Sequence, residues 1–128
     1  MNEEQNNRAD SRFIIVKQKE REITEETGVF EDSFELETMS LLFFEAVARA
    51  NYTGPTANAG IRVKLTVNGN LQALNQSFEA QSNTIDFWAS AATTMLLPQG
   101  HHTVRAERLN NQVTGGYYLR ASYVVISS

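Results

Sequence analysis

Apolar and polar residues alternate with a period of two through most of this chain, and this alternation constrains the fold more than any other feature. Residues 61–67 show it most clearly, with Ile, Val, Leu and Val separated by Arg, Lys and Thr. A strand with one face in a core and the other in solvent has this pattern. Asn68 and Gly69 follow, and Asn-Gly is the preferred dipeptide of a two-residue hairpin turn. The sequence therefore predicts a strand, a tight turn and a returning strand that begins near Leu71.

A second constraint is the corner within the long alternating stretch 85–108. Pro98 fixes its own φ, and Gly100 can adopt positive φ without strain. We therefore expect a type II turn that joins two paired strands. Phe87 and Trp88 are neighbours on the first of these strands, so their rings must lie on opposite faces.

Further strands are predicted at residues 12–17, 29–37 and 117–127, with a charged edge or arm at 18–26, a short strand about Phe78, and loops at 53–60 and 110–116. Residues 39–52 fit helical spacing as well. Six consecutive apolar positions at period two favour a strand there. About eight strands with turn signals and no convincing helix predict an all-β fold, an antiparallel β-sandwich of the jelly-roll type.

The length of 128 residues fits one domain. Residues 1–11 are almost wholly polar, so we predict a flexible tail there and a single β-sandwich domain over residues 12–128. The first residues contain no apolar signal-peptide core, and no run approaches a membrane span. We therefore expect a soluble protein that is not secreted by that route and does not contact a membrane. The chain has no cysteine, so thiol and disulfide chemistry are excluded.

Charge is distributed unevenly along the chain. Residues 1–45 hold twelve acids and five bases, a net −7, whereas residues 46–128 hold three acids and six bases, a net +3. Either the two parts pair within one sheet system or across a subunit contact, or an acidic face keeps the protein soluble. The bases are scattered singly, so nucleic acid is not expected as a partner.

No catalytic or metal-binding constellation emerges from the sequence. His101 and His102 are adjacent, so on a strand they point to opposite faces and cannot easily chelate one metal. We expect both at the surface, and we predict no metal site unless a symmetric oligomer shares one histidine per chain. Ser90, Ser122 and Asp86 could join His101 in hydrolysis, but no motif supports this. We therefore predict no enzyme, no catalytic residue and no cofactor.

Aromatic residues offer one candidate binding surface. Trp88, Tyr117, Tyr118 and Tyr123 could form a sugar-stacking platform, because aromatic faces suit the apolar faces of pyranose rings. Trp88 and Tyr117 are the predicted stacking residues. The alternative is that these rings pack in the core or at an interface, and an exposed Trp88 would favour binding.

The closing strand at residues 117–127 carries apolar residues on both faces. Such a strand is usually central in its sheet or lies against another subunit. Tyr118, Val124 and Ile126 share one face and are the predicted subunit contacts.

Residues 96–105 and 118–126 resemble the last strands of jelly-roll domains in bacteriophage virion proteins and in the wider tumour-necrosis-factor-like and C1q-like group. The resemblance covers roughly residues 38–127. A Leu-Pro-x-Gly corner before a strand also recurs in other β-sandwiches, including carbohydrate-binding modules. The resemblance implies a trimer or higher assembly on a particle surface or fibre, and it carries over no functional residue.

The sequence thus leads to two hypotheses about function. The first is a non-enzymatic structural protein of a virion surface, as a decoration, head-fibre or tail-associated component. It would self-associate, with a trimer favoured, and contact other virion or particle proteins. The alternative is a carbohydrate-binding module or lectin-like domain that binds glycans.

Overall fold

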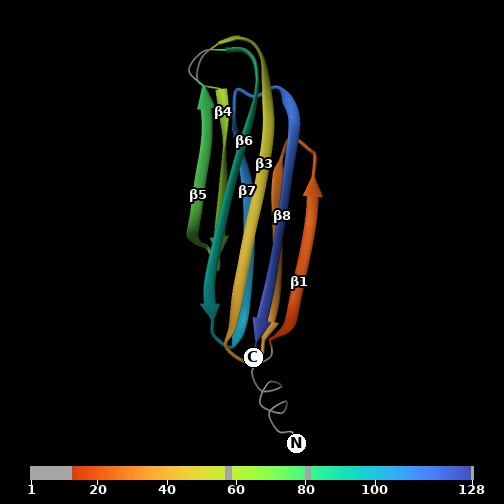
Figure 1. Ribbon diagram of the computed structural model, residues 1–128, viewed down its shortest axis with the longest axis vertical. Helices are drawn as coiled ribbons and strands as arrows, with labels where there is room; N and C mark the ends of the chain where they lie inside the picture. Colours follow the sequence, from red (N-terminus) through yellow and green to blue (C-terminus); the bar gives the residue numbers. More distant parts are fainter. Residues whose placement is uncertain (1–12, 57–58, 80–81, 128) are drawn as a thin grey trace, which may run out of the picture.

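Eight strands make up the computed structural model, which describes residues 13–56, 59–79 and 82–127 (Figure 1). They are β1 (Ile14–Ile23), β2 (Gly28–Leu36), β3 (Ser40–Thr56), β4 (Ala59–Val67), β5 (Asn70–Glu79), β6 (Ser82–Leu97), β7 (Gly100–Asn111) and β8 (Gly115–Ser127). No helix capable of crossing a bilayer occurs among these residues. The tail predicted at residues 1–11 lies outside the described residues.

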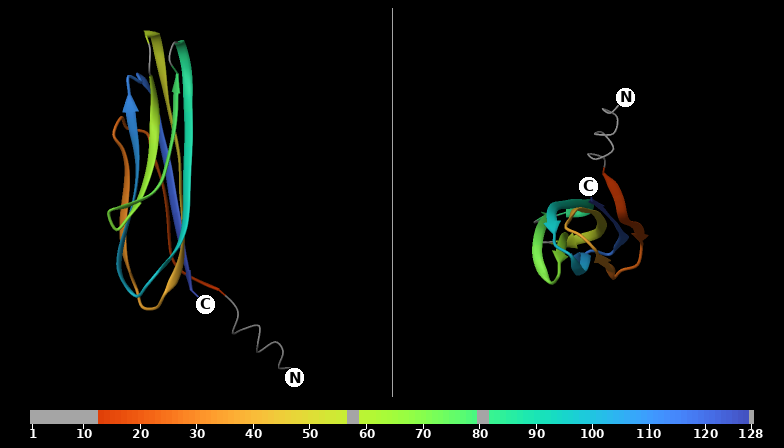
Figure 2. Two further views of the ribbon diagram at one scale, coloured as in Figure 1. Left: turned by 90° about the vertical axis from the view of Figure 1, so that its left-hand side faces the viewer. Right: turned by 90° about the horizontal axis from the view of Figure 1, so that it is seen from below.

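The strands form two antiparallel four-stranded sheets that pack face to face (Figure 2). Sheet A has the order β1-β8-β3-β6, and sheet B has the order β2-β7-β4-β5. Every connection crosses from one sheet to the other except the β4–β5 hairpin. This is the strand order of an eight-stranded jelly roll. The predicted all-β, antiparallel β-sandwich of jelly-roll type is confirmed.

The core lies between the sheets and is built by the alternation. On β4 every second side chain is fully buried, namely Ile61, Val63, Leu65 and Val67. On β3, which is confirmed as a strand rather than a helix, the side chains from Leu42 to Tyr52 at even positions are buried in the same way. Because consecutive strand residues point to opposite faces, the intervening positions form the outer faces of the sheets.

The β4–β5 hairpin has the predicted turn. Asn68 has φ 53° and Gly69 has φ 82°, so both central residues lie in the positive-φ region that a type I′ turn requires. The turn also contacts β7, since the backbone N–H of Asn68 donates to the Thr103 carbonyl at 2.8 Å.

The corner at Pro98 differs from the prediction. It joins β6 of sheet A to β7 of sheet B, so the two flanking strands do not pair with each other. A type II turn with Pro98 at its second position would need positive φ at Gln99, whereas the positive φ of 131° is at Gly100. The prediction of a turn between paired strands was wrong, because Pro and Gly signal a reversal without indicating whether it closes within one sheet or between two.

Strands near the predicted loop 53–60 are longer than expected. β3 continues to Thr56 and β4 begins at Ala59, and a register shift in the β3–β6 ladder between Thr53 and Thr56 accommodates the turn-forming residues. The short strand predicted about Phe78 is part of the ten-residue β5.

Within each sheet, a strand from the acidic part of the chain (residues 1–45) pairs with a strand from the basic part (residues 46–128). β2 pairs with β7, where Arg105 lies 3.2 Å from Glu31, and β1 pairs with β8, where Arg120 lies 4.0 Å from Glu20. β8, the closing strand with apolar residues on both faces, lies between β1 and β3 and is therefore an interior strand of sheet A. The charge imbalance is thus partly compensated within the sandwich.

Candidate functional site

Two aromatic side chains flank one arginine on the outer face of sheet A. Arg49 of β3 is directly opposite Trp88 of β6 on one side and Tyr118 of β8 on the other. Their chain neighbours Ala48, Phe87 and Leu119 are buried. The alternation therefore places Trp88, Arg49 and Tyr118 in one row on the solvent side of three adjacent strands.

The two rings lean toward each other over Arg49. β6 and β8 are separated by β3, so their backbones are about 9.5 Å apart. The ring centroids of Trp88 and Tyr118 are only 6.4 Å apart, with an interplanar angle of 59°. The Arg49 guanidinium lies 5.6 Å from the indole centroid, within cation–π range. Trp88 nevertheless stays 56% exposed, so much of its surface is free to contact a ligand.

Polar groups surround these rings. Arg49 Nη2 donates to Asp86 Oδ1 at 3.1 Å, and the Tyr118 hydroxyl donates to Glu22 Oε2 at 3.1 Å. Desolvation and, after it, the hydrogen bond to Glu22 raise the pKa of Tyr118. The site therefore combines aromatic surface with an oriented guanidinium and two carboxylates.

All of these side chains except Glu22 line a groove of about 560 Å³, which we name the aromatic groove. Its lining is Thr24, Val47, Arg49, Asp86, Trp88, Gly116, Tyr117, Tyr118 and Arg120. A ligand in the aromatic groove can stack on exposed ring surface and hydrogen-bond at its periphery. The arrangement suits a molecule with one apolar face and several hydroxyl groups.

The predicted stacking residues occupy different positions. Trp88 is at the centre of the aromatic groove. Tyr117 lines it, but its ring packs against the core, and the Arg108 guanidinium lies 5.3 Å from its centroid. Tyr118, predicted as a subunit contact and considered for the stacking platform, is the ring partner of Trp88. Tyr123 is only 1% exposed, so it cannot offer a ring to a ligand.

The other two predicted subunit contacts lie at the opposite end of sheet A. Val124 is directly opposite Phe43 of β3, and Ile126 is opposite Leu41 of β3. Both are half-buried and on the same outer face as Tyr118. The three predicted contacts thus share a face, as the alternation requires, but belong to two separate surfaces.

The two histidines point to opposite faces of β7. His101 is exposed, with Nδ1 2.7 Å from Glu35 Oε2. His102 was expected at the surface, but it is buried, because its even position on β7 points into the core. Its Nε2 donates to the Pro98 carbonyl at 2.7 Å, and its Nδ1 accepts from Asn68 Nδ2 at 2.9 Å. Among the described residues no group of three or more His, Cys, Asp or Glu side chains is arranged to hold a metal.

The residues considered for hydrolysis do not meet. Ser90, Ser122 and Asp86 lie on the outer face of sheet A, whereas His101 lies on the outer face of sheet B. Asp86 is engaged by Arg49, and His101 is engaged by Glu35. No nucleophile and base come within hydrogen-bond reach in this set.

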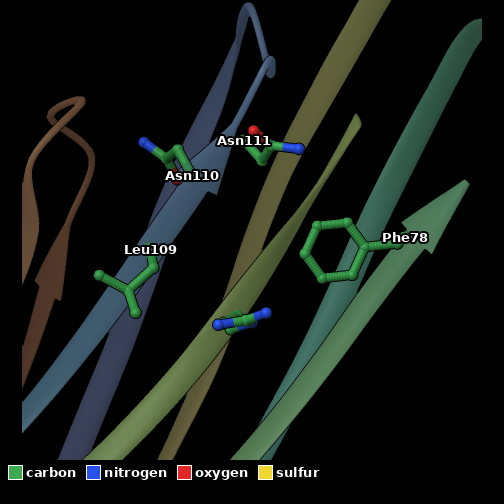
Figure 3. Close-up of a pocket in the computed structure, with 5 residues that line it drawn as sticks. Phe78, Leu109, Asn110 and Asn111 are labelled. Carbon is green, nitrogen blue, oxygen red and sulfur yellow. The ribbon is translucent and has the colours of Figure 1, made fainter. Parts of the chain in front are cut away.

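A smaller hollow of about 270 Å³ lies on the outer face of sheet B (Figure 3). Figure 3 shows Phe78 and Leu109 on either side of it. The Phe78 ring covers Gly60 so closely that a Cβ there would lie 2.3 Å from the ring. Asn110 is held by Glu26 and Arg108. These side chains already serve the packing of this end, so the aromatic groove is the better candidate site.

No protein-family model matches this chain, and no curated protein matches it. Among solved structures, the native structure of a family 35 carbohydrate binding module from Clostridium thermocellum aligns with 91% of this chain and 98% of its own, at 20% identity and a TM-score of 0.36. The identity and the TM-score are too low for this similarity to bear on function. The fold assignment rests on the strand order of the two sheets.

Proposed function

We propose that this protein binds carbohydrate through the aromatic groove. The observation that carries the proposal is the exposed indole of Trp88 beside the ring of Tyr118, both on strands of sheet A. A large aromatic side chain on a strand normally gains stability by burial, so one held in solvent on a rigid sheet is available for a ligand. A pyranose ring offers the complementary apolar face.

The polar groups of the groove support the same ligand class. The Arg49 guanidinium is fixed by Asp86 on one side and by the indole on the other. A donor and an acceptor held side by side suit neighbouring hydroxyl groups of a sugar. Because Arg49 is already ordered, a ligand does not have to immobilise this long side chain.

The separation of the carboxylates favours binding over hydrolysis. Glu22 is on β1 and Asp86 is on β6, at the two edges of sheet A. Three strand spacings separate them by about 14 Å across the sheet, and Glu22 is level with Ser90, four residues or about 13 Å along β6 from Asp86, so their backbones are about 19 Å apart. Glycosidases place their two carboxyl groups about 5 to 9.5 Å apart. We therefore propose a non-catalytic, lectin-like role.

Fluorescence tests this function directly, because Trp88 is the sole tryptophan. We expect titration with a panel of neutral and acidic glycans to change its emission for at least one of them. Trp88→Ala, followed by calorimetry, should weaken that binding by about fivefold or more, if stacking of a sugar on the ring contributes as much as base stacking does, on the order of 1–3 kcal/mol. Leu74→Ala is the matched control, since Leu74 is similarly exposed but lies on β5 of sheet B. A panel without any response, or a Trp88→Ala variant that binds like the wild type, would refute the proposal.

The virion-surface role, and the particle proteins expected as its partners, stay predictions from the sequence. Self-association is a separate question, since the residues that bear on it lie at the other end of sheet A.

A further inference from the structure

Four aliphatic side chains form a row across the whole width of sheet A. Leu41 of β3 is directly opposite Leu96 of β6 and Ile126 of β8, and Ile126 is opposite Ile15 of β1. We name these four residues the aliphatic row. Phe43 and Val124 extend it on the next outward-facing positions. The row contains no charged side chain.

A register shift on β1 completes the aliphatic row. Between Ile15 and Lys17 the pairing with β8 slips by one residue. After the shift, Glu20 and Glu22 are paired with outward-pointing residues of β8. Before the shift, Ile15 is paired with an outward-pointing residue, Ile126. The irregularity therefore places an isoleucine on the outer face beside Ile126, and a side chain on that face is solvated unless a partner covers it.

This end of the molecule concentrates exposed apolar surface. Of the twelve exposed large hydrophobic side chains among the described residues, seven lie here: Phe13, Ile14, Ile15, Val16, Met39, Phe43 and Leu96. Ile15, Phe43 and Leu96 share the outer face of sheet A, whereas Ile14 is opposite Ser127 and points to the inner side. A large side chain offers on the order of 150–200 Å² when fully exposed, so the three half-exposed outward residues present about 300 Å². That is within the range of the largest apolar patch on a typical monomer, and the half-buried Leu41, Val124 and Ile126 add to it. The total stays below the roughly 800 Å² per partner of a standard interface, as a reversible contact requires.

The amino-acid composition limits which part of the chain, or which partner, can cover this apolar surface. Residues 1–12 adjoin Phe13, but their only apolar members are Met1 and Ala9. They cannot supply matching apolar area. The surface itself can, because an uncharged aliphatic row is complementary to a second copy of the same row across a two-fold axis. Edge-to-edge pairing through β1 is disfavoured, because Lys17, Lys19 and Arg21 line that edge strand.

We propose that two copies of this chain associate face to face through the aliphatic row and the apolar residues around it. Val124 and Ile126 lie in this contact, whereas Tyr118 does not. Trp88 and Leu96 are eight residues apart on β6, a separation of about 26 Å, so both aromatic grooves stay accessible. The pair would present two grooves at once, and a glycan with repeated units would then bind with higher avidity.

Sedimentation equilibrium on the full chain tests the contact. We expect a reversible dimer at micromolar concentration and a dimer dissociation constant raised at least about tenfold by Leu96→Asp, because an interfacial carboxylate would have to be desolvated. Leu96 is 62% exposed, so the variant should fold, and circular dichroism verifies this. Ile15→Lys is the second variant and should act in the same way. Leu74→Asp on sheet B is the control and should leave the dimer unchanged.

Three outcomes would overturn the proposal. One is a wild-type chain that is monomeric up to high micromolar concentration. Another is a dimer that both Leu96→Asp and Ile15→Lys leave intact. The third is a dimer that is lost when residues 1–11 are removed, since the tail would then form the contact.

Discussion

The hydroxyl of Tyr123 on β8 donates a hydrogen bond to Asp32 Oδ2 on β2, across the interior between the two sheets. Asp32 is the single polar side chain at an inward position of β2, among Phe30, Phe34 and Leu36. Lys19 Nζ lies 3.6 Å from its other oxygen. A residue that interrupts the alternation of β2 is therefore the acceptor for a buried phenol.

Tyr123→Phe should lower the free energy of unfolding by about 1–3 kcal/mol, because it removes the phenol donor from a half-buried carboxylate. Urea denaturation at neutral pH measures the change. Tyr118→Phe removes a hydroxyl that bonds to Glu22 at the surface and should leave the urea midpoint close to that of the wild type. Equal effects of the two variants would contradict the role assigned to the Asp32 bond.

Asp32 should also contribute to acid sensitivity. Desolvation raises its pKa, but the bonds from Tyr123 and the Ser33 backbone and the charges of Lys19 and Lys17 outweigh this, and the pKa lies below the ordinary 3.8. A depressed folded pKa gives stability that is present above the unfolded value and is lost as pH falls through the folded value. Melting temperatures of Asp32→Asn should therefore fall less than those of the wild type between about pH 5 and pH 2. Parallel curves would contradict this.

Alternation predicted the strands and their buried faces, because burial on one side imposes a period of two on any strand. It could not predict which strands pair. Trp88, Arg49 and Tyr118 are far apart along the chain, and only the register of β6, β3 and β8 brings them into one row. The phase of Trp88 against Phe87 indicated that one of the two rings faces outward, but not which one. The roles of Asp32 and Tyr118 depend on contacts between distant strands, so no local pattern indicates them.

The two histidines should respond differently to truncation. His102 is 5% exposed and uses both ring nitrogens, one toward Asn68 and one toward Pro98. His102→Ala should therefore cost about 2–4 kcal/mol, since it removes two hydrogen bonds and leaves a cavity. His101→Ala removes an exposed pair with Glu35 and should cost less than about 1 kcal/mol. Thermal or urea unfolding of the two variants provides the comparison, and a harmless His102→Ala would contradict the buried network.

Arg108 should hold the β1–β2 connection. Its side chain is 3% exposed, and Nη2 donates to the carbonyls of Glu25 at 2.9 Å and Glu26 at 2.6 Å. Arg108→Met should cost about 1–2 kcal/mol and speed cleavage after these glutamates by a glutamate-specific protease. Arg62→Met changes an exposed arginine on β4 and serves as the control. Unchanged cleavage in Arg108→Met would show that the connection is held by other contacts.

Gly100 provides the test of the corner between the sheets. Its φ of 131° is unfavourable for an L residue, and no heavy atom lies within 4 Å of a Cβ built there, so any cost of a side chain comes from the backbone and not from a clash. Gly100→Ala should lower the free energy of unfolding by about 1–2 kcal/mol. Gly115 on β8 has no positive φ, and its nearest contact would be Asn51 Oδ1 at an ordinary 3.5 Å. Gly115→Ala should therefore stay within about 0.5 kcal/mol of the wild type. Urea unfolding of both variants separates backbone strain from the general effect of replacing a glycine, and equal stabilities would contradict strain at position 100.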